Sequence, residues 1–356
     1  MSDARLAHRA RAVVLPVGGL RPVSLVVGIA ALIVVLGVGV VVGAADIGVG
    51  AIVREFLGAI PGIEVDSGLT DAQRGILWRI RLPRVVLGAL VGATLAVAGA
   101  AYQGVFRNPL ADPYLLGVAA GAGLGATLAI VYGPAGLPID LVPVFAFVGA
   151  LGGVGLAYTL GRAVTGVRST TSLILAGVAV AAFLTAVQTF VQQRNTDVLR
   201  QVWSWILGRL TTSGWSEVAV LLPSAVVSIA VILLHRRLLD VLAVGEEEAR
   251  TLGVRTGRVR IVIVVAASLG TAAAVSVSGL IGFVGIIVPH AVRLLTGTSY
   301  RVILPLSIVG GAAFLVAADI LGRTLVSPAE LPIGVVTAFF GAPFFAVVLR
   351  TSRRLS

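Results

Sequence analysis

Long runs of uncharged, mostly apolar residues recur along this chain, and they limit what it can fold into. A helix needs roughly 20 apolar residues to cross the hydrocarbon core of a bilayer, and many of these runs come close to that length. Only 12% of the 356 residues are charged, against about a quarter in a soluble domain. The sequence therefore predicts an all-α polytopic membrane protein and leaves no room for a large soluble domain.

Charged residues and prolines divide the apolar sequence into about ten candidate transmembrane helices. They lie near residues 23–44, 84–105, 115–132, 142–162, 172–192, 217–234, 260–279, 281–295, 302–322 and 332–350. We expect one transmembrane domain over residues 23–350, between an N-terminal segment, 1–22, and a short tail, 351–356. Arginines before the first span place the N-terminus in the cytoplasm by the positive-inside rule. Alternation through an even number of spans places the tail there too, together with the arginine-rich loop 235–258.

The composition excludes several kinds of site. The chain has no cysteine, which rules out disulfides, thiol catalysis and thiolate metal sites. All 27 basic residues are arginine, so the lysine of a P-loop, G-x-x-x-x-G-K-[ST], is missing. If the protein uses ATP and Mg²⁺, another subunit must bind them, and we expect this chain to bind no cofactor. The net charge of +11 fits cytoplasmic loops rather than nucleic-acid binding.

The only acidic run, Glu246 to Glu248, lies in the predicted cytoplasmic loop. It suits the first turn of a short helix, where negative charge meets the positive end of the helix dipole. Arg250 follows Glu246 at i,i+4 spacing, and Gly253 supplies a C-terminal stop. Most charge runs are solvated surfaces, so the loop is either a solvated connector or a docking helix for a cytoplasmic partner.

The same topology places a group of arginines on the outer side of the membrane. They are Arg74, Arg79, Arg81 and Arg84 before the second span and Arg323 after the ninth. This placement runs against the positive-inside rule. The arginines could pair with an acidic extracytoplasmic partner or reach lipid phosphates. Asp319, inside a predicted span, either pairs with Arg323 one turn later or belongs to a proton relay.

Two distant segments weakly resemble each other. Residues 84–109 and 260–289 both run from an arginine through an apolar span and a small-residue turn to a proline. Their predicted directions are opposite, as expected for the inverted repeat of a transporter. In the second segment, Ser278 to His290 has glycine every third residue before Pro289, which predicts a bend into a short or re-entrant helix.

Six motifs then follow one another in order. They are R-L-P-R (81–84), A-G-A-A-Y-Q-G-V-F-R-N-P-L-A-D-P-Y-L-L-G-V (98–118), S-T-T-S-L-I-L-A-G-V-A (169–179), G-E-E-E-A-R-T-L-G-V (245–254), G-L-I-G-F-V-G-I-I-V-P-H-A-V-R-L (279–294) and A-E-L-P-I-G-V-V-T-A-F-F-G-A-P-F-F (329–345). In these motifs the chain resembles the FecCD/BtuC-type permeases, the membrane subunits of type II ATP-binding-cassette (ABC) importers. The resemblance covers nearly the whole chain beyond the first 20 residues.

The resemblance implies partners and site residues. It implies a homodimer, or a pair with a paralogous permease, two cytoplasmic ATP-binding subunits and an extracytoplasmic substrate-binding protein. The implied ATPase-coupling residues are Gly245, Glu246, Glu247, Glu248, Arg250, Leu252 and Gly253. The implied docking residues for the binding protein are Arg81, Arg84 and Arg323. The implied cytoplasmic gate is Ser169, Thr170, Thr171 and Ser172, and the fifth span would line the path. Arg74 and Arg79 have no counterpart in this pattern.

We therefore expect the permease subunit of an ATP-driven importer for an iron-siderophore, haem or cobalamin in the cytoplasmic membrane. Such a subunit makes no bonds and is not an enzyme. The alternative is an ion-coupled secondary transporter, which would explain Asp319 and the broken helices but not the acidic loop or the outer arginines. An intramembrane enzyme would have only His290 with Ser278 to work with, and we interpret His290 as a packing or capping residue.

Overall fold

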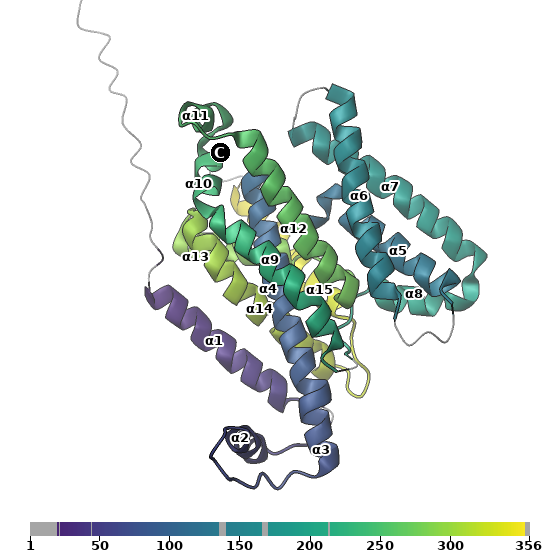
Figure 1. The fold of residues 1–356 in the computed structure, drawn as a ribbon, viewed down its shortest axis with the longest axis vertical. Coiled ribbons are helices and arrows are strands. Elements are labelled where there is room, and N and C mark those ends of the chain that lie inside the picture. Colours follow the sequence, from purple (N-terminus) through teal and green to yellow (C-terminus); the bar gives the residue numbers. More distant parts are fainter. Residues whose placement is uncertain are drawn as a thin grey trace, which may run out of the picture.

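The computed structural model describes residues 20–352 except residues 21, 44, 135–139, 166–169 and 213. Each of the predicted spans corresponds to a helix in it (Figure 1). Seven are long and apolar enough to cross a membrane, and three are shorter. They are α1 (Pro22–Val41), α4 (Leu82–Phe106), α5 (Val118–Tyr132), α6 (Val142–Thr165), α7 (Thr170–Arg194), α9 (Ser216–Leu234), α12 (Thr256–Ser278), α13 (Val284–Thr296), α14 (Tyr300–Thr324) and α15 (Ile333–Ser352). Most of the predicted N-terminal segment 1–22 and of the tail 351–356 lies outside the described residues.

Several short helices connect the spans. The acidic loop holds the predicted one, α11 (Glu246–Thr251). The others are α2 (Val49–Gly58), α3 (Asp71–Ile76), the π-helix η1 (Leu77–Arg81), the 3₁₀-helices η2 (Pro113–Leu116) and η3 (Thr196–Val198), α8 (Leu199–Ile206) and α10 (Arg236–Val244). None of these other helices was predicted from the sequence, because none contains an apolar run long enough to cross a bilayer. They bury few residues, and α3 and η3 bury none.

Helix α4 forms the centre of the fold. Every residue from Val91 to Phe106 is buried, and the helix packs against α9, α12, α13 and α14. The run is rich in glycine and alanine, and such small residues let membrane helices approach closely. A helix that is apolar all round, as this one is, is expected in the interior of a bundle.

One contact of α4 leaves no room for a side chain. A Cβ at Gly99 would overlap the backbone of Gly285 in α13. We expect Gly99→Ala to push the two helices apart and to destabilise the protein by about 1–3 kcal/mol, read as a lower melting temperature in detergent. Gly152→Ala in α6 is the matched control, because its Cβ would meet nothing within 4 Å. Equal melting temperatures for the two variants would contradict this packing.

The bundle has two ends, and the chain alternates between them. In Figure 1, α2 and α3 lie at the lower end, which we call the α2 end. Helices α10 and α11 lie at the upper end, which we call the α11 end. Helix α4 runs from the α2 end toward the α11 end, and α12 starts beside α11 and runs the other way. The two helices therefore run in opposite directions, as predicted for the two weakly similar segments.

The predicted bend after α12 is present. Helix α12 ends at Ser278, and residues 279–283 are not helical before α13 begins. The Tyr114 hydroxyl stabilises the break: it donates a hydrogen bond to the carbonyl of Ile281 at 2.9 Å and accepts one from its backbone N–H at 3.1 Å. The break therefore satisfies its backbone polar groups with a side chain, as a non-helical segment at membrane depth must.

Candidate functional site

The predicted coupling segment folds as two short helices joined by one extended residue. Helix α10 ends at Val244, Gly245 is extended, and α11 runs from Glu246 to Thr251. Gly253 ends the turn with a φ of +78°, and its N–H donates to the Arg250 carbonyl at 2.9 Å. A left-handed residue at this place favours glycine. The predicted helix and its predicted stop are both confirmed.

Helix α11 has one buried residue, and most of its other described residues are exposed. Ala249 is fully buried, whereas Glu247, Glu248 and Arg250 are exposed. Leu252, just after the helix, has 70% of its surface exposed. The side chain of Glu246 lies outside the described residues. An exposed leucine bordered by carboxylates is the kind of surface that a protein partner covers, with an apolar centre and a charged rim.

Asp240 links this segment to the membrane-spanning bundle. Its carboxylate accepts hydrogen bonds from the Ser299 hydroxyl and the Tyr300 N–H at 3.0 and 2.5 Å, and it pairs with Arg301 at 3.4 Å. These three residues form the N-terminal end of α14, where negative charge is favourable. Asp240 was not among the residues predicted from the sequence. The signal was an acid between the apolar residues of a short amphipathic segment.

The other end of α14 holds a buried ionic cluster. Asp319 lies 2.8 Å from the Arg84 guanidinium and 3.1 Å from the Nε of Arg323, and its side chain is only 4% exposed. Arg84 also pairs with Glu330 at 2.9 Å. The predicted Asp319–Arg323 pair is therefore confirmed. A carboxylate held between two arginines has the partners of a structural ion pair, so the cluster gives the proton-relay alternative no support.

Two of the arginines predicted to lie on the outer side bind carbonyl groups within the chain. Arg81 is buried, and its guanidinium donates to the carbonyls of Val40 and Val41 at 3.1 and 2.9 Å. Arg323 donates to the carbonyls of Gly39 and Val42 at 3.2 and 3.0 Å. Both arginines thus cap the C-terminal end of α1, which carries free carbonyls and partial negative charge. This explains why arginines lie at the α2 end without any external partner.

These contacts bear on the predicted docking residues. The expectation was that Arg81, Arg84 and Arg323 face a binding protein, but in the single chain their side chains are turned inward onto α1 and the ionic cluster. Of the three, Arg84 alone has an exposed partner, because 46% of the Glu330 side chain is accessible. A docking role for the three arginines stays a prediction.

Arg74, whose role was open, links α3 to α2. It donates from Nε to Glu55 at 2.9 Å, and Ser67 and Trp78 donate to the same carboxylate at 2.6 and 3.1 Å. The hydrogen bond from Arg74 is the main reason why the pKa of Glu55 falls to about 2. The stabilisation is complete above the ordinary carboxyl pKa of 4.5 and is lost as the pH falls through about 2. Arg79 is exposed.

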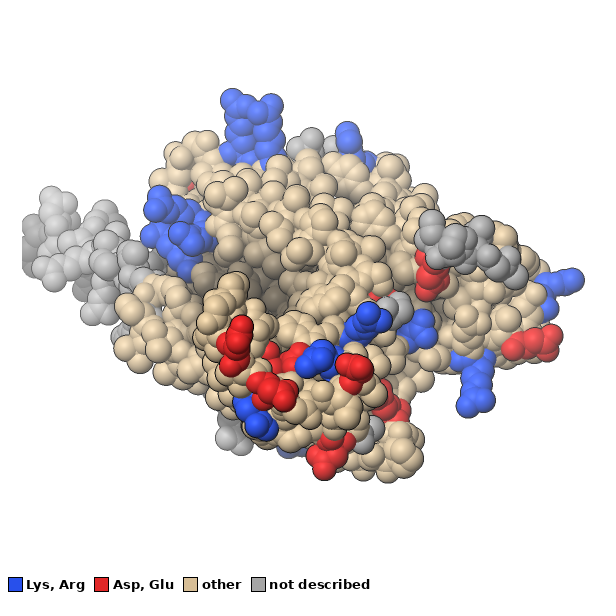
Figure 2. All heavy atoms as spheres, turned by 60° about the horizontal axis from the view of Figure 1, so that its bottom comes forward, with Lys and Arg blue, Asp and Glu red and all other residues tan. Residues whose placement is uncertain are grey.

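The surface at the α2 end carries charges of both signs (Figure 2). Asp46, Glu64, Asp66 and Asp71 are exposed there, as is Arg54. An acidic partner would therefore meet repulsive as well as attractive charges on this face.

The predicted gate is described only in part. Ser169 lies outside the described residues, and Thr170 and Thr171 are the first residues of α7, with side chains that are not described. Ser172 is half-buried in the same turn. The gate assignment stays a prediction. His290 stacks edge-to-face on Phe344, with ring centroids 5.8 Å apart, which agrees with a packing residue.

Known proteins of similar sequence and fold are permeases. The FecCD transport family matches residues 31–351. The ABC transporter permease protein YvrB of Bacillus subtilis is 40% identical, over 94% of this chain and 95% of that protein. The cobalamin import system permease protein BtuC of Halobacterium salinarum is 46% identical, over 80% of this chain and 75% of that protein. A structure described as an inward-facing conformation of a metal-chelate type ABC transporter superposes with a TM-score of 0.80 at 27% identity, over 93% of this chain and all of that one.

These matches extend along most of the chain and agree with its all-helical, multi-pass fold. A permease of this kind carries solute, while a separate subunit hydrolyses ATP and a binding protein delivers the solute. The chain belongs to the FecCD transport family and is a multi-pass membrane permease subunit of an ABC importer.

Proposed function

We propose that this permease imports a bulky metal chelate of the cobalamin, haem or iron-siderophore type, with the α11 end in the cytoplasm. The relatives that support this class are a cobalamin permease and a metal-chelate type transporter. The orientation is supported by the arginines of residues 235–258, which favour the cytoplasmic side. Both described ends of the chain, the start of α1 and the end of α15, then lie on that side.

The observation that supports the coupling role is the exposed face of α11, which follows a helix, α10, that is attached to the bundle. Glu247, Glu248 and Leu252 are exposed, while Asp240 fastens the preceding helix to α14. In this proposal, ATP and Mg²⁺ bind to the ATPase partner and not to this chain. Closure of the ATPases moves α11 and α10, and Asp240 passes the movement to α14.

The path of that movement through the bundle is short. Helix α14 packs against α4, and Gly92 and Gly311 leave no room for a side chain between them. The two helices are joined again at the α2 end by Arg84 and Asp319. They therefore move as one body, from the ATPase side to the binding-protein side. Transport requires that ATP binding favours one position of this body over the other.

Two copies of the chain, or one copy and a paralogous permease, would enclose the path. Helices α7 and α15 expose large aromatic side chains, including Phe183, Phe190 and Phe339, and such surfaces mark helix interfaces or lipid contact. We propose that α7 lines the path, with Ser169 to Ser172 as its cytoplasmic gate. Light scattering of the purified protein in detergent tests the assembly. A protein mass of 36.3 kDa, that of one chain, would contradict the dimer.

Uptake into proteoliposomes tests the function. The permease is reconstituted with its ATPase and its binding protein, and uptake of labelled cobalamin, haem and a ferric siderophore is measured with ATP on the ATPase side. We expect one chelate class to accumulate only when ATP, ATPase and binding protein are all present. Accumulation by the permease alone, driven by a proton or sodium gradient, would establish the secondary-transporter alternative instead.

Docking of the binding protein gives a sharper prediction. We propose that an acidic side chain of the binding protein replaces Glu330 beside Arg84, because Glu330 is the exposed member of the ionic cluster. Glu330→Gln removes this competitor and should tighten docking up to about fivefold, the value of an exposed ion pair. The gain should shrink as salt is added. Asp140→Asn, at another exposed acid, is the control. Weaker docking by Glu330→Gln would show that Glu330 itself binds the partner.

A further inference from the structure

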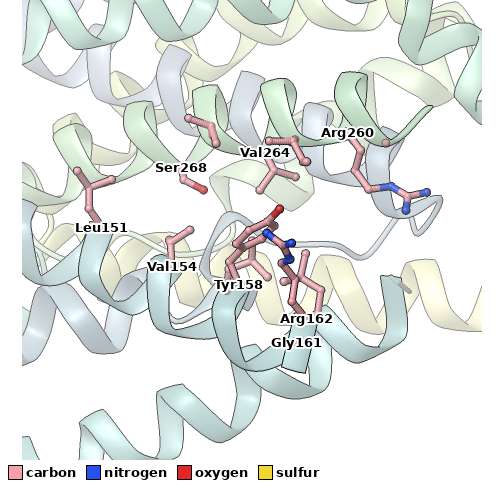
Figure 3. A pocket seen from close by; sticks show the side chains of 14 residues that line it. Leu151, Val154, Tyr158, Gly161, Arg162, Arg260, Val264 and Ser268 are labelled. Atoms are coloured by element: carbon pink, nitrogen blue, oxygen red, sulfur yellow. The ribbon is translucent and has the colours of Figure 1, made fainter. Parts of the chain in front are cut away.

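A half-open cavity of about 300 Å³ lies between α6 and α12 and contains no residue of α10, α11 or the ionic cluster. Figure 3 shows side chains of the two helices pointing toward one another across it. Leu151 and Val154 of α6 and Val264 of α12 line its apolar part. Ser268 lies on its wall, but its hydroxyl is hydrogen-bonded to Tyr102 at 2.6 Å. The interior is therefore apolar apart from one polar group that is already paired.

One end of the cavity is basic. Arg162 lies near the end of α6, Arg260 lies near the start of α12, and both line the cavity. These two positions belong to the α11 end of the bundle. The Arg162 guanidinium lies 5.6 Å from the centre of the Tyr158 ring, so an aromatic residue and two cations share this end. Tyrosine and arginine together are typical of the level where lipid headgroups lie.

The length of the cavity fits one leaflet. Leu151 and Arg162 are eleven residues apart on α6, which corresponds to about 16 Å of helix rise. The hydrocarbon core of a bilayer is about 30 Å thick, so one leaflet contributes about half of that. The groove thus runs from the headgroup level to near the middle of the membrane, with its basic end at the headgroup level.

We propose that this groove is a binding site for an anionic phospholipid of the leaflet at the α11 end. One acyl chain lies between α6 and α12, and the phosphate lies between Arg162 and Arg260. Arginine pairs well with phosphate oxygens, and basic pockets between membrane helices on the cytoplasmic side are known to select anionic headgroups. The choice of the cytoplasmic leaflet rests on the proposed orientation, but the site itself does not rest on transport.

A lipid here would join the two halves of the bundle. Helices α5, α6 and α7 pack with one another, while α12 packs chiefly with α4 and α9. The cavity lies where α6 meets α12, and α12 follows directly after α11. An acyl chain in this groove would fill the space between the group α5, α6 and α7 and helix α12, which follows the coupling segment.

Native mass spectrometry of the purified full-length chain tests the site. The delipidated protein is mixed with phosphatidylglycerol and phosphatidylcholine in equal amounts, and the retained lipid is identified. We expect a preference of about 30-fold for phosphatidylglycerol, since each arginine near a charged headgroup contributes about fivefold. The double variant Arg162→Gln with Arg260→Gln should lose this preference. Arg258→Gln, an exposed arginine near Arg260 that does not line the groove, should keep it.

A second variant tests the acyl chain separately. Gly155 lines the cavity, and a Cβ there would meet nothing within 4 Å, so Gly155→Phe fills the groove without disturbing the helix packing. It should abolish lipid retention while leaving the melting temperature near that of the wild type. Equal retention of both lipids by the wild type would overturn the proposal, and so would full retention by Gly155→Phe. Displacement of the lipid by the transported chelate would show that the groove belongs to the path.

Discussion

Reversing two charges on α11, by Glu247→Arg with Glu248→Arg, should reduce the ATPase activity that the binding protein stimulates, and with it ATP-driven uptake, by at least about 100-fold. The two carboxylates are exposed, so the change should barely affect the stability of the single chain. In the complex they would face the ATPase, where like charges in contact cost several kcal/mol. The measurement is the ATPase activity that the loaded binding protein stimulates, with size-exclusion chromatography to count the bound ATPase subunits.

The matched control for this prediction is Asp197→Arg. Asp197 is also exposed, but it follows α7 at the α2 end of the bundle, away from α11. It undergoes the same acid-to-arginine reversal at a single position and should leave ATPase binding intact. Glu247→Gln with Glu248→Gln should show an intermediate loss, because it removes attraction without adding repulsion. If the doubly reversed variant retains normal stimulated activity, α11 is a solvated connector and the coupling proposal is wrong.

Removing Asp319 should cause the largest loss of stability. Asp319→Ala leaves the side chains of Arg84 and Arg323, which are 12% and 6% exposed, without their shared carboxylate. Breaking a buried ion pair from one side costs about 3–5 kcal/mol, because a charge stays buried without compensation. We expect a clearly lower melting temperature in detergent and poor recovery of monodisperse protein.

Glu330→Ala is the comparison for Asp319→Ala. It removes the other carboxylate that Arg84 contacts, but one that is 46% exposed, and exposed pairs contribute only about 0–1 kcal/mol. The two variants therefore separate a structural ion pair from a surface one within the same cluster. Equal melting temperatures for both would mean that water reaches Asp319 and that the cluster does not hold α4 and α14 together.

Much of the fold can be predicted from the sequence because few backbone structures can span a bilayer. Apolar runs divided by charged residues and prolines located the ten predicted spans, three of which are short, and the arginine pattern supported an alternation of directions that the bundle shows. Local spacing also sufficed where the contact was local. Asp319 and Arg323 are one helical turn apart, and Gly253 ends α11 through its own backbone conformation.

Contacts between segments that are distant in the sequence could not be predicted from it. Arg81 binds carbonyls near Val40, and every residue has a carbonyl, so nothing in the sequence marks these as the acceptors. Asp240 pairs with residues about 60 positions later, and only the packing of α10 on α14 brings them together. The groove between α6 and α12 likewise exists only once both helices are placed. For the arginines at the α2 end, the charge pattern indicated an acidic external partner or lipid phosphates, and it did not predict that Arg81 binds carbonyls of the chain itself.

The capping of α1 has a consequence for biogenesis. The carbonyl of Val42 accepts a hydrogen bond from an arginine that follows it by 281 residues, whereas Arg81 reaches the same helix end from about 40 residues away. Because a chain leaves the ribosome from its N-terminus, Arg81 becomes available to α1 soon after α1 itself is made. Arg323 becomes available only after the helices from α4 to α13 have been made. The C-terminal end of α1 is thus fully capped only once α14 is in place.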